Sequence, residues 1–440
     1  MFFIIGLSIS YLYFTVIKSE EAEEVTITDP VELDSDKEDT HLSKVADTDG
    51  VYWQRMFDIF WNNVEPKEGN FNWDDIDEKM NMCSENNIYP LAMIKPFANW
   101  DQDSCHGEEY EAEFDPKKGG EIKVGKPCDM EAYKEFLAKV VERYDGDGRN
   151  DMQGLKIPIK YWEIMNEPSM QGGSSGGMGE ELKFFVGTSG EYNEILQASY
   201  ETIKEADPNA KVVQGGMAGM QSEFQEFWTP VLEAGGGDYF DIANMHTINT
   251  DENREDLYMI KFNEYLEEFG LEDKPIWITE VQYGELTEEP EDLSEMEVTM
   301  VKSTVFSLAQ GADKLFYIEN WFYWGEDPSG SKTNIEEKKA LSTHQVYLNL
   351  VDKISDFEEV TTLEEEYYDN DGEWNGVTSS SGVYKFDKGD YAIYVMWGDS
   401  SIPSELRGQV KVTDIYGEYE IVYTGNIVLD ENPIFIESVD

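Results

Sequence analysis

The chain has 440 residues, of which 93 are acidic and 33 basic, so its formal net charge is −60 at pH 7. So strong a negative charge argues against nucleic acid and anionic lipid surfaces as partners, because both would be repelled at long range. Hydrophobic residues make up 40% of the chain and aromatic residues 13%. This is enough for a large globular core, and the length allows one large domain with a smaller one.

The N-terminal segment has the features of a targeting sequence. Residues 1–17 carry no charge and are followed at once by an acidic stretch. An uncharged run of this length is typical of a secretory signal peptide, and it barely suffices to span a bilayer. The sequence predicts a signal peptide or membrane anchor over residues 1–18 and an acidic linker over residues 19–45. Cleavage and anchoring both stay open, and membrane contact is expected only through this segment. The protein is therefore expected to be secreted or anchored at the cell surface.

Three cysteines are too few for a fold built on disulfides. Cys83 lies in an amphipathic run and is expected to be a buried free thiol. Cys105 and Cys128 bracket one polar insertion, and in an oxidising compartment they could close that loop as a disulfide.

From Val51 onward, strand-like and helix-like segments alternate. The predicted strands are Val51–Phe57, Tyr89–Lys95, Lys160–Met165, Lys211–Gln214, Phe240–Met245, Ile276–Thr279 and Lys314–Ile318. Alternation over about 300 residues predicts parallel strands, in a (β/α)8 barrel or an open doubly wound sheet. No nucleotide-binding glycine motif follows any strand, which favours an α/β fold of the (β/α)8 TIM barrel type over residues 46–355. An eighth strand is expected before Val51.

The pattern changes after the helix predicted over residues 337–352. Short alternating runs separated by glycine, aspartate and serine turns then follow: Gly382–Phe386, Tyr391–Trp397, Gly408–Asp414, Glu418–Tyr423 and Ile434–Glu437. Such runs are typical of antiparallel strands. They predict a C-terminal all-β, sandwich-like module over residues 356–440, packed against the barrel.

Two of the predicted barrel strands end on a glutamate. The segment Tyr161–Pro168 reads YWEIMNEP and the segment Pro275–Glu280 reads PIWITE, which would place Glu167 after strand four and Glu280 on strand seven. Catalytic residues of such barrels lie at the carboxyl ends of the strands. A lone Asn-Glu-Pro is usually a solvated turn, but two carboxylates delivered in this way are the groups that glycoside hydrolysis requires.

These motifs resemble those of the clan A retaining glycoside hydrolases, closest to families 39 and 5, over roughly residues 51–324. The resemblance implies that Glu167 is the general acid/base and Glu280 the nucleophile. It also implies that Asn166 binds the sugar 2-hydroxyl and that Arg55 keeps Glu280 ionised and oriented.

Further contacts with substrate follow from the same resemblance. His246 resembles the strand-six histidine that contacts the sugar or the acid/base. Thr247-Ile248 follows it where relatives usually place a tyrosine, so Tyr283 or Tyr317 could replace that tyrosine beside the nucleophile. Aromatic rings stack on the apolar faces of sugars, and the candidates at strand ends are Trp100, Trp321 and Trp324, with Trp321 or Trp324 as the strand-eight platform.

One acidic loop resembles a fragment of a calcium-binding loop. Asp145, Asp147 and Asp151 alternate with glycines, and carboxylates so spaced can surround a hard cation. The bidentate glutamate of a full motif is missing, because Lys156 stands in its place. A structural Ca²⁺ site and a plain acidic turn stay equally open, and catalysis is expected to need no cofactor.

The sequence as a whole predicts a retaining glycoside hydrolase that cleaves β-glycosidic bonds in oligo- or polysaccharides by double displacement. The expected partner is therefore a carbohydrate substrate. Two alternatives remain: a non-catalytic glycan-binding surface protein using the same aromatic cleft, and a transglycosylase on the same fold.

Overall fold

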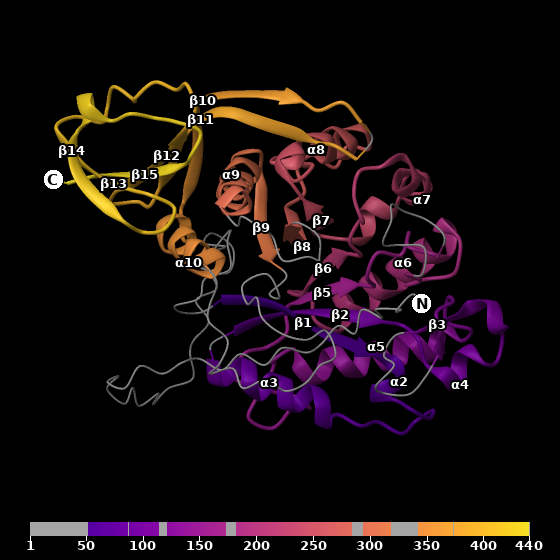
Figure 1. Ribbon diagram of the computed structural model, residues 1–440. Coiled ribbons are helices and arrows are strands. Elements are labelled where there is room, and N and C mark those ends of the chain that lie inside the picture. The colour runs from indigo at the N-terminus through magenta and orange to yellow at the C-terminus, as the bar shows by residue number, and fades with distance from the viewer. Residues whose placement is uncertain are drawn as a thin grey trace, which may run out of the picture.

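A computed structural model of the chain describes residues 52–86, 88–113, 121–172, 182–283, 294–317, 342–372 and 374–439. These form an α/β part and a C-terminal all-β sheet, which lie side by side (Figure 1). The predicted signal peptide or anchor, the linker and the expected eighth strand lie outside the described residues. Within the described ranges, no helix is both long and apolar enough to cross a membrane.

The α/β part contains two parallel sheets. The first has the order β1-β2-β5-β6, formed by Tyr52–Phe60, Ile88–Lys95, Tyr161–Ile164 and Lys211–Gln214. The second has the order β7-β8-β9, formed by Ala243–Thr250, Ile276–Tyr283 and Ala312–Tyr317. Parallel bridges from Val213 to Ile242 and from Met217 to Met245 connect β6 with β7. Strands β9 and β1 approach each other, but within the described residues no backbone pairing joins them. The described strands therefore follow one another in chain order, and they correspond to the seven expected from the sequence.

Helices separate these strands. They are α2 (Trp61–Val64), α3 (Asp74–Asn86), α4 (Asn99–Gln102), α5 (Met130–Tyr144), α6 (Ser189–Ala206), α7 (Ser222–Glu233), α8 (Met259–Glu268), α9 (Ser294–Ala309) and α10 (Ser342–Ile354). Side chains bind free backbone N–H groups at the starts of two of these helices: Asp129 caps α5, and Thr188 with Glu191 forms a capping box on α6. A short hairpin that the sequence did not predict, β3 (Glu111–Glu113) with β4 (Glu121–Lys123), lies between α4 and α5.

A layer of large side chains is enclosed between the strands. It consists of Leu91, Tyr161, Val213, Ile242, Trp277 and Phe316, with Trp53 packed against it. The amine of Lys314, also buried, lies 4.1 Å from the centre of the Trp53 ring. Side chains two positions further along a strand point to the same side. The next layer, towards the carboxyl ends, is therefore formed by the residues two positions after Trp53, Tyr161, Ile242 and Trp277.

The C-terminal part is one six-stranded antiparallel sheet, not the two packed sheets that the sequence suggested. Its order is β10-β11-β12-β15-β13-β14, formed by Glu359–Asp369, Val377–Asp387, Ala392–Trp397, Gln409–Thr413, Tyr419–Tyr423 and Ile434–Ser438. Apolar side chains of one face, such as Phe386 and Trp397, belong to the same core as α9 and α10. Those of the other face pack with connecting-loop residues such as Leu406 and Leu429. Helices and loops therefore cover the sheet, and a second sheet is not required.

The hairpin of β10 and β11 extends from this sheet to the segment that follows β7 (Figure 1). Ser379 N donates to the Glu255 carboxylate at 2.8 Å, and Val377 N donates to the Asp256 carboxylate at 2.9 Å. Both acidic residues are buried. The backbone of β11 thus supplies hydrogen bonds that these buried carboxylates require, which joins the two parts of the chain.

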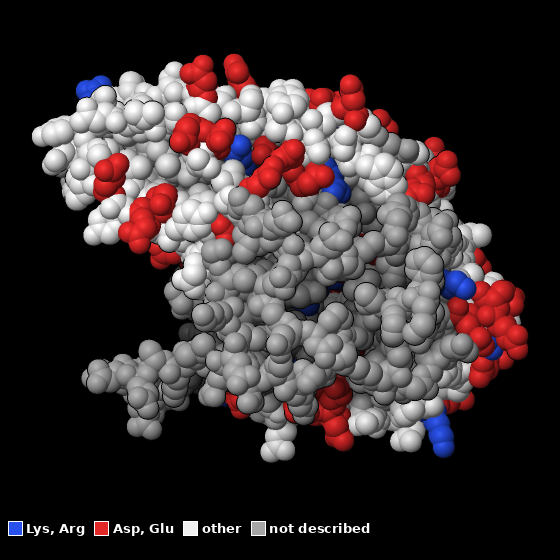
Figure 2. Space-filling model, viewed as in Figure 1, with Lys and Arg blue, Asp and Glu red and all other residues white. Residues whose placement is uncertain are grey.

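Acidic side chains are spread over the C-terminal sheet and the α/β part alike, with few basic ones among them (Figure 2). The acidic groups visible in this view lie in several separate places and do not form one patch. This distribution is that of a solvated, highly charged surface.

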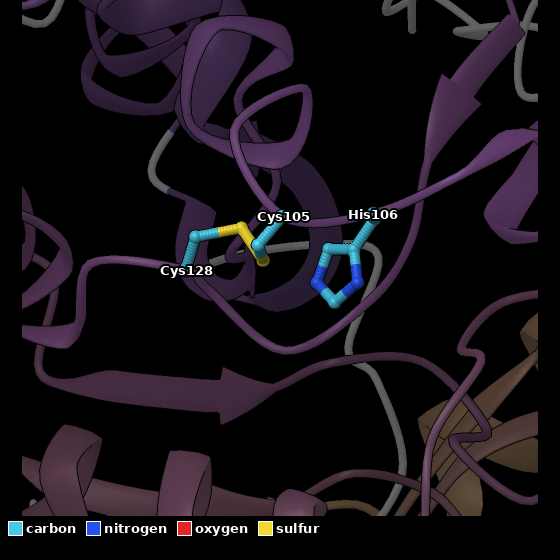
Figure 3. A group of neighbouring side chains, drawn as sticks. All are labelled: Cys105, His106 and Cys128. Carbon is cyan, nitrogen blue, oxygen red and sulfur yellow. A yellow bond between two sulfur atoms is a disulfide. The ribbon is translucent and has the colours of Figure 1, made fainter.

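Cys105 and Cys128 form a disulfide with a Cα–Cα distance of 5.9 Å. It connects the end of α4 with the start of α5, and the ring of His106 lies beside it (Figure 3). The carboxylate of Asp101 accepts hydrogen bonds from the backbone N–H groups of Cys128 and Asp129, at 2.9 and 2.8 Å. Cys83 is a buried free thiol.

Removing this disulfide should lower stability, since it closes a loop with a sequence separation of 23. Loop-closure entropy gives about 3 kcal/mol for a loop of this size. We expect the double variant Cys105→Ser/Cys128→Ser to lose about that much free energy of unfolding, measured by urea denaturation. A reductant should destabilise the parent protein and leave the double variant unchanged. Equal stability of the two proteins would contradict the prediction.

Stability should also depend on the protonation of Glu255. Burial raises the pKa of Glu255 from 4.5 to about 7, against the opposing effect of the Lys302 amine. Because the folded state holds this proton more tightly than the unfolded state, the Glu255 contribution to stability declines as pH rises from about 4.5 to about 7. We expect Glu255→Gln to flatten the pH dependence of the melting temperature over that interval. Parallel profiles for the parent protein and the variant would refute this role.

Candidate active site

The site lies at the carboxyl ends of the parallel strands. Strand alternation brings Arg55, Glu163, Asn244 and Thr279 into one layer, two positions beyond the enclosed aromatic layer. Further along the same strands lie Glu167, after β5, His246, within β7, and Glu280, within β8. Residues that are far apart in the sequence are therefore in contact in the site.

Arg55 is the cation at the centre of the site. Its Nε and Nη2 atoms donate to both oxygens of Glu163 at 2.6 and 2.8 Å, and Nη1 donates to Glu280. Nη2 also donates to Oδ1 of Asn166 at 2.6 Å. Glu163 is fully buried. One planar guanidinium thus orients two carboxylates and one amide, which an ammonium group could not do with fixed geometry.

Glu280 is held in its ionised form. Burial by itself would raise the pKa of this carboxyl, but the charge of His246 in its protonated form and the charge of Arg55 outweigh it and hold the pKa below its ordinary value of 4.5. The carboxylate is also about a fifth exposed, so it can be reached from outside. An accessible, oriented anion is what a nucleophilic carboxylate requires.

Glu167 has the opposite environment. Burial raises its pKa above 4.5 against the lowering effect of His246, and the neighbouring Glu280 charge acts in the same direction as burial. The backbone at this point is strained, since Met165 and Glu167 have φ angles of 70° and 39°. Residues with side chains rarely adopt this left-handed region. The left-handed conformations of Met165 and Glu167 end β5 at Ile164 and direct the Glu167 carboxyl towards His246.

His246 connects the two glutamates. Its Nδ1 atom lies 2.8 Å from Oε1 of Glu167 and 3.8 Å from Oε2 of Glu280. One oxygen of each glutamate and a ring nitrogen of His246 all lie within 4.8 Å of one another. The ring is fully buried and packs against Gly216, where a Cβ atom would lie 2.1 Å from Nε2. A side chain at position 216 would therefore displace the histidine.

The expected aromatic contacts are distributed differently. Trp100 packs edge-on against Trp61 at 5.1 Å, and its indole N–H donates to the Glu65 carbonyl at 2.9 Å. Tyr283 and Tyr317 stack on each other with ring centres 6.0 Å apart. Tyr317 also contacts Tyr347 of α10. These contacts account for the positions of all three rings through packing, and their binding to sugar stays a prediction. Trp321 and Trp324 lie outside the described residues.

Among the residues that the structure describes, three groups of side chains have the spacing of metal ligands. In the group of Cys105, His106 and Cys128, the two sulfurs are bonded to each other (Figure 3). In the group of Glu167, His246 and Glu280, the Arg55 cation already occupies a Glu280 oxygen. The third group is the acidic loop.

The oxygens of Asp145, Asp147 and Asp151 lie within 4.8 Å of one another. Burial and the two other carboxylates raise the pKa of Asp145 to about 6, against the lowering effect of the Asp147 backbone N–H. Backbone N–H groups of the loop also bind these carboxylates, as in a plain acidic turn. Calcium binding by this loop stays a prediction.

Sequence reasoning overlooked part of the site. Glu163, Asn244 and Thr279 are not among the residues that the sequence predicts for the site. Lys95, whose amine lies 2.8 Å from Asp58, also helps to lower the pKa of Glu280. Counting by two along each strand from its aromatic residue would have found Glu163, Asn244 and Thr279, because this period fixes which side chains point inward.

Comparison with known proteins shows what this fold resembles. No protein-family model and no curated protein matches the chain, whereas many solved structures do. A family 39 glycoside hydrolase from Bacteroides cellulosilyticus WH2 is 16% identical with a TM-score of 0.54, covering 88% of this chain and 75% of its own.

Two further solved structures are similar. A glucosidase from Croceicoccus marinus is 12% identical with a TM-score of 0.53, covering 84% of this chain and 82% of its own. A family 44 xyloglucanase from Paenibacillus polymyxa is 10% identical with a TM-score of 0.51, covering 91% of this chain and 97% of its own. The resemblance to glycoside hydrolases, including family 39, is therefore confirmed at the level of the fold.

Replacing Arg55 should be costly for folding. Removal of one partner from a buried ion pair leaves an uncompensated charge and typically costs about 3–5 kcal/mol. We expect Arg55→Met to lose free energy of unfolding on this scale, measured by urea denaturation at neutral pH. Arg149→Met is the matched control, because Arg149 is 81% exposed and lies 3.7 Å from its partner Asp147. Equal effects of the two substitutions would contradict the central role of Arg55.

Proposed function

We propose that the protein is a retaining glycoside hydrolase that cleaves β-glycosidic bonds in oligo- or polysaccharides. The observation that carries this proposal is the pair Glu167 and Glu280, whose oxygens approach within 4.8 Å while their environments shift the two pKa values in opposite directions. Retaining enzymes need two carboxyls about 5–5.5 Å apart, one protonated and one ionised. Inverting enzymes need a wider gap that admits a water molecule.

In the first step, Glu280 attacks the anomeric carbon as the bond to the leaving oxygen breaks, and Glu167 gives its proton to that oxygen. The product is a glycosyl ester on Glu280 together with the released alcohol. In the second step, Glu167 removes a proton from water, whose oxygen attacks the anomeric carbon. The free sugar leaves, Glu280 returns to its ionised form, and Glu167 is protonated again.

Asn166 is suited to bind the sugar beside the reacting carbon. Arg55 occupies its Oδ1 atom at 2.6 Å, so the orientation of the amide is fixed and its NH₂ group is the part that can donate to substrate. A hydrogen bond to the 2-hydroxyl strengthens as positive charge develops in the transition state. We therefore assign Asn166 to substrate binding with Nδ2 as the donor.

We infer a (β/α)8 barrel in which a strand before Tyr52 completes the parallel series, and a carbohydrate as the partner. We also infer a place outside the cytoplasm, secreted or tethered through residues 1–18. The Cys105–Cys128 disulfide supports this location, because disulfides persist in oxidising compartments.

Substrate turnover should depend on both glutamates. We expect the protein to hydrolyse at least one member of a panel of β-linked aryl glycosides and polysaccharides. Glu280→Gln should lose several orders of magnitude in kcat, because the covalent step is removed. Glu167→Gln should lose less on aryl glycosides with a good leaving group, which needs no proton.

The control is Glu255→Gln, which neutralises another buried carboxylate, held by the β11 backbone outside the site. Near-normal turnover by Glu280→Gln would refute the nucleophile assignment. Binding of glycans without turnover would favour a glycan-binding protein, and longer products after addition of acceptor sugars would favour a transglycosylase.

The pH profile of kcat/KM should be a broad bell. Activity requires Glu280 ionised and Glu167 protonated. Because the pKa of Glu280 is lowered and that of Glu167 is raised, the acidic limb should fall below the ordinary carboxyl range and the alkaline limb above it. Steady-state kinetics on an aryl glycoside would measure both limbs. A narrow bell centred near pH 4.5 would contradict the two opposite shifts.

A further inference from the structure

The orientation of the Asn244 amide follows from its partners. Its Nδ2 atom lies 3.1 Å from the Glu163 carboxylate and 3.2 Å from the Gln214 carbonyl, and both of these only accept. Its Oδ1 atom lies 3.3 Å from the backbone N–H of Thr279, which only donates. A flipped amide would oppose acceptor to acceptor and donor to donor, so only one orientation satisfies the site.

This orientation determines the direction of the Thr279 hydroxyl. Oγ1 of Thr279 lies 2.9 Å from Oδ1 of Asn244, which can only accept. The hydroxyl proton must therefore point to Asn244, because two lone pairs would repel at that distance. Oγ1 also lies 2.9 Å from Nε2 of His246. Since its proton is already used, the hydroxyl can only accept from the ring, and Nε2 must carry a hydrogen.

We propose that Asn244 and Thr279 are positioning residues that keep a proton on Nε2 of His246, so that Nδ1 and Glu167 share one further proton between them. This inference rests on the proposed function in assigning Glu167 as the acid/base. The shared proton would lie between Nδ1 of His246 and Oε1 of Glu167, which are 2.8 Å apart. Gly216 beneath the ring and the backbone bond from His246 N to the Met217 carbonyl, at 2.7 Å, hold the ring in this register.

The arrangement has a consequence for each step of the reaction. When the proton is on Glu167, the lone pair of Nδ1 accepts it in a hydrogen bond. After Glu167 has protonated the leaving oxygen, that lone pair faces a carboxylate, which favours return of a proton from water. The charged groups around the ring are Arg55 from β1, Glu163 and Glu167 from the β5 region, and Glu280 from β8.

The first test is the tautomer of His246, measured by long-range ¹H–¹⁵N correlation on the uniformly labelled full chain. The chain has four histidines, and the loss of one signal set in His246→Gln assigns the resonance. We expect a protonated Nε2 across the pH range in which the protein is folded, whether the shared proton lies on Nδ1 or on Glu167. A neutral ring protonated on Nδ1 alone would overturn the proposal. This spectrum needs no activity, so it also stands if the proposed function fails.

The second test removes the hydroxyl. In Thr279→Val, Nε2 loses its acceptor, so the neutral ring should take its proton on Nδ1 and donate it to the Glu167 carboxylate. Such a bond favours the ionised acid, so the alkaline limb of kcat/KM should move to lower pH by about one unit. Thr279→Ser retains the hydroxyl and should keep the parent profile. An unchanged limb in a folded Thr279→Val protein would overturn the proposal, as would equal shifts in both variants.

Discussion

The site depends on one buried guanidinium. Arg55 contacts Glu163 and Glu280, and it also orients Asn166. A cation of this kind is stable inside the protein only when its charge and its donors are matched. Glu163 supplies much of that match, since both of its oxygens face Arg55. Glu280 can therefore remain a reactive anion, because it is not the only group that stabilises the arginine.

From this cation, a series of hydrogen bonds continues to the other glutamate. Glu163 accepts from Asn244, Asn244 accepts from Thr279, and Thr279 contacts His246, which reaches Glu167. Each of these groups has few alternatives, because it is buried and its neighbours fix whether it donates or accepts. The different environments of the two glutamates thus arise within one connected network, and a change at any member affects more than its direct neighbour.

The sequence predicted the parts of this structure that have a local signature. Strand periodicity gave the seven parallel strands, and the two strings ending at Glu167 and Glu280 indicated the acidic pair. The sequence did not predict the acidic strand β10, because the residues of this strand are mostly exposed and its register comes from pairing with β11. Asn244 and Thr279 have no signature of their own either. Their function depends on neighbours more than thirty positions away, and only the folded chain brings these together.

The contact between the β10–β11 hairpin and the segment after β7 affects how the chain can be divided. Glu255 and Asp256 belong to the α/β part, yet backbone N–H groups of Ser379 and Val377 hydrogen-bond their carboxylates. A chain ending near residue 355 would leave both acidic groups without these donors, only a few residues from the strand that carries His246. The C-terminal sheet is therefore not a module that could be exchanged freely for another. Recombination with other catalytic parts would require a matching acidic pair, so the two parts are expected to evolve as one unit.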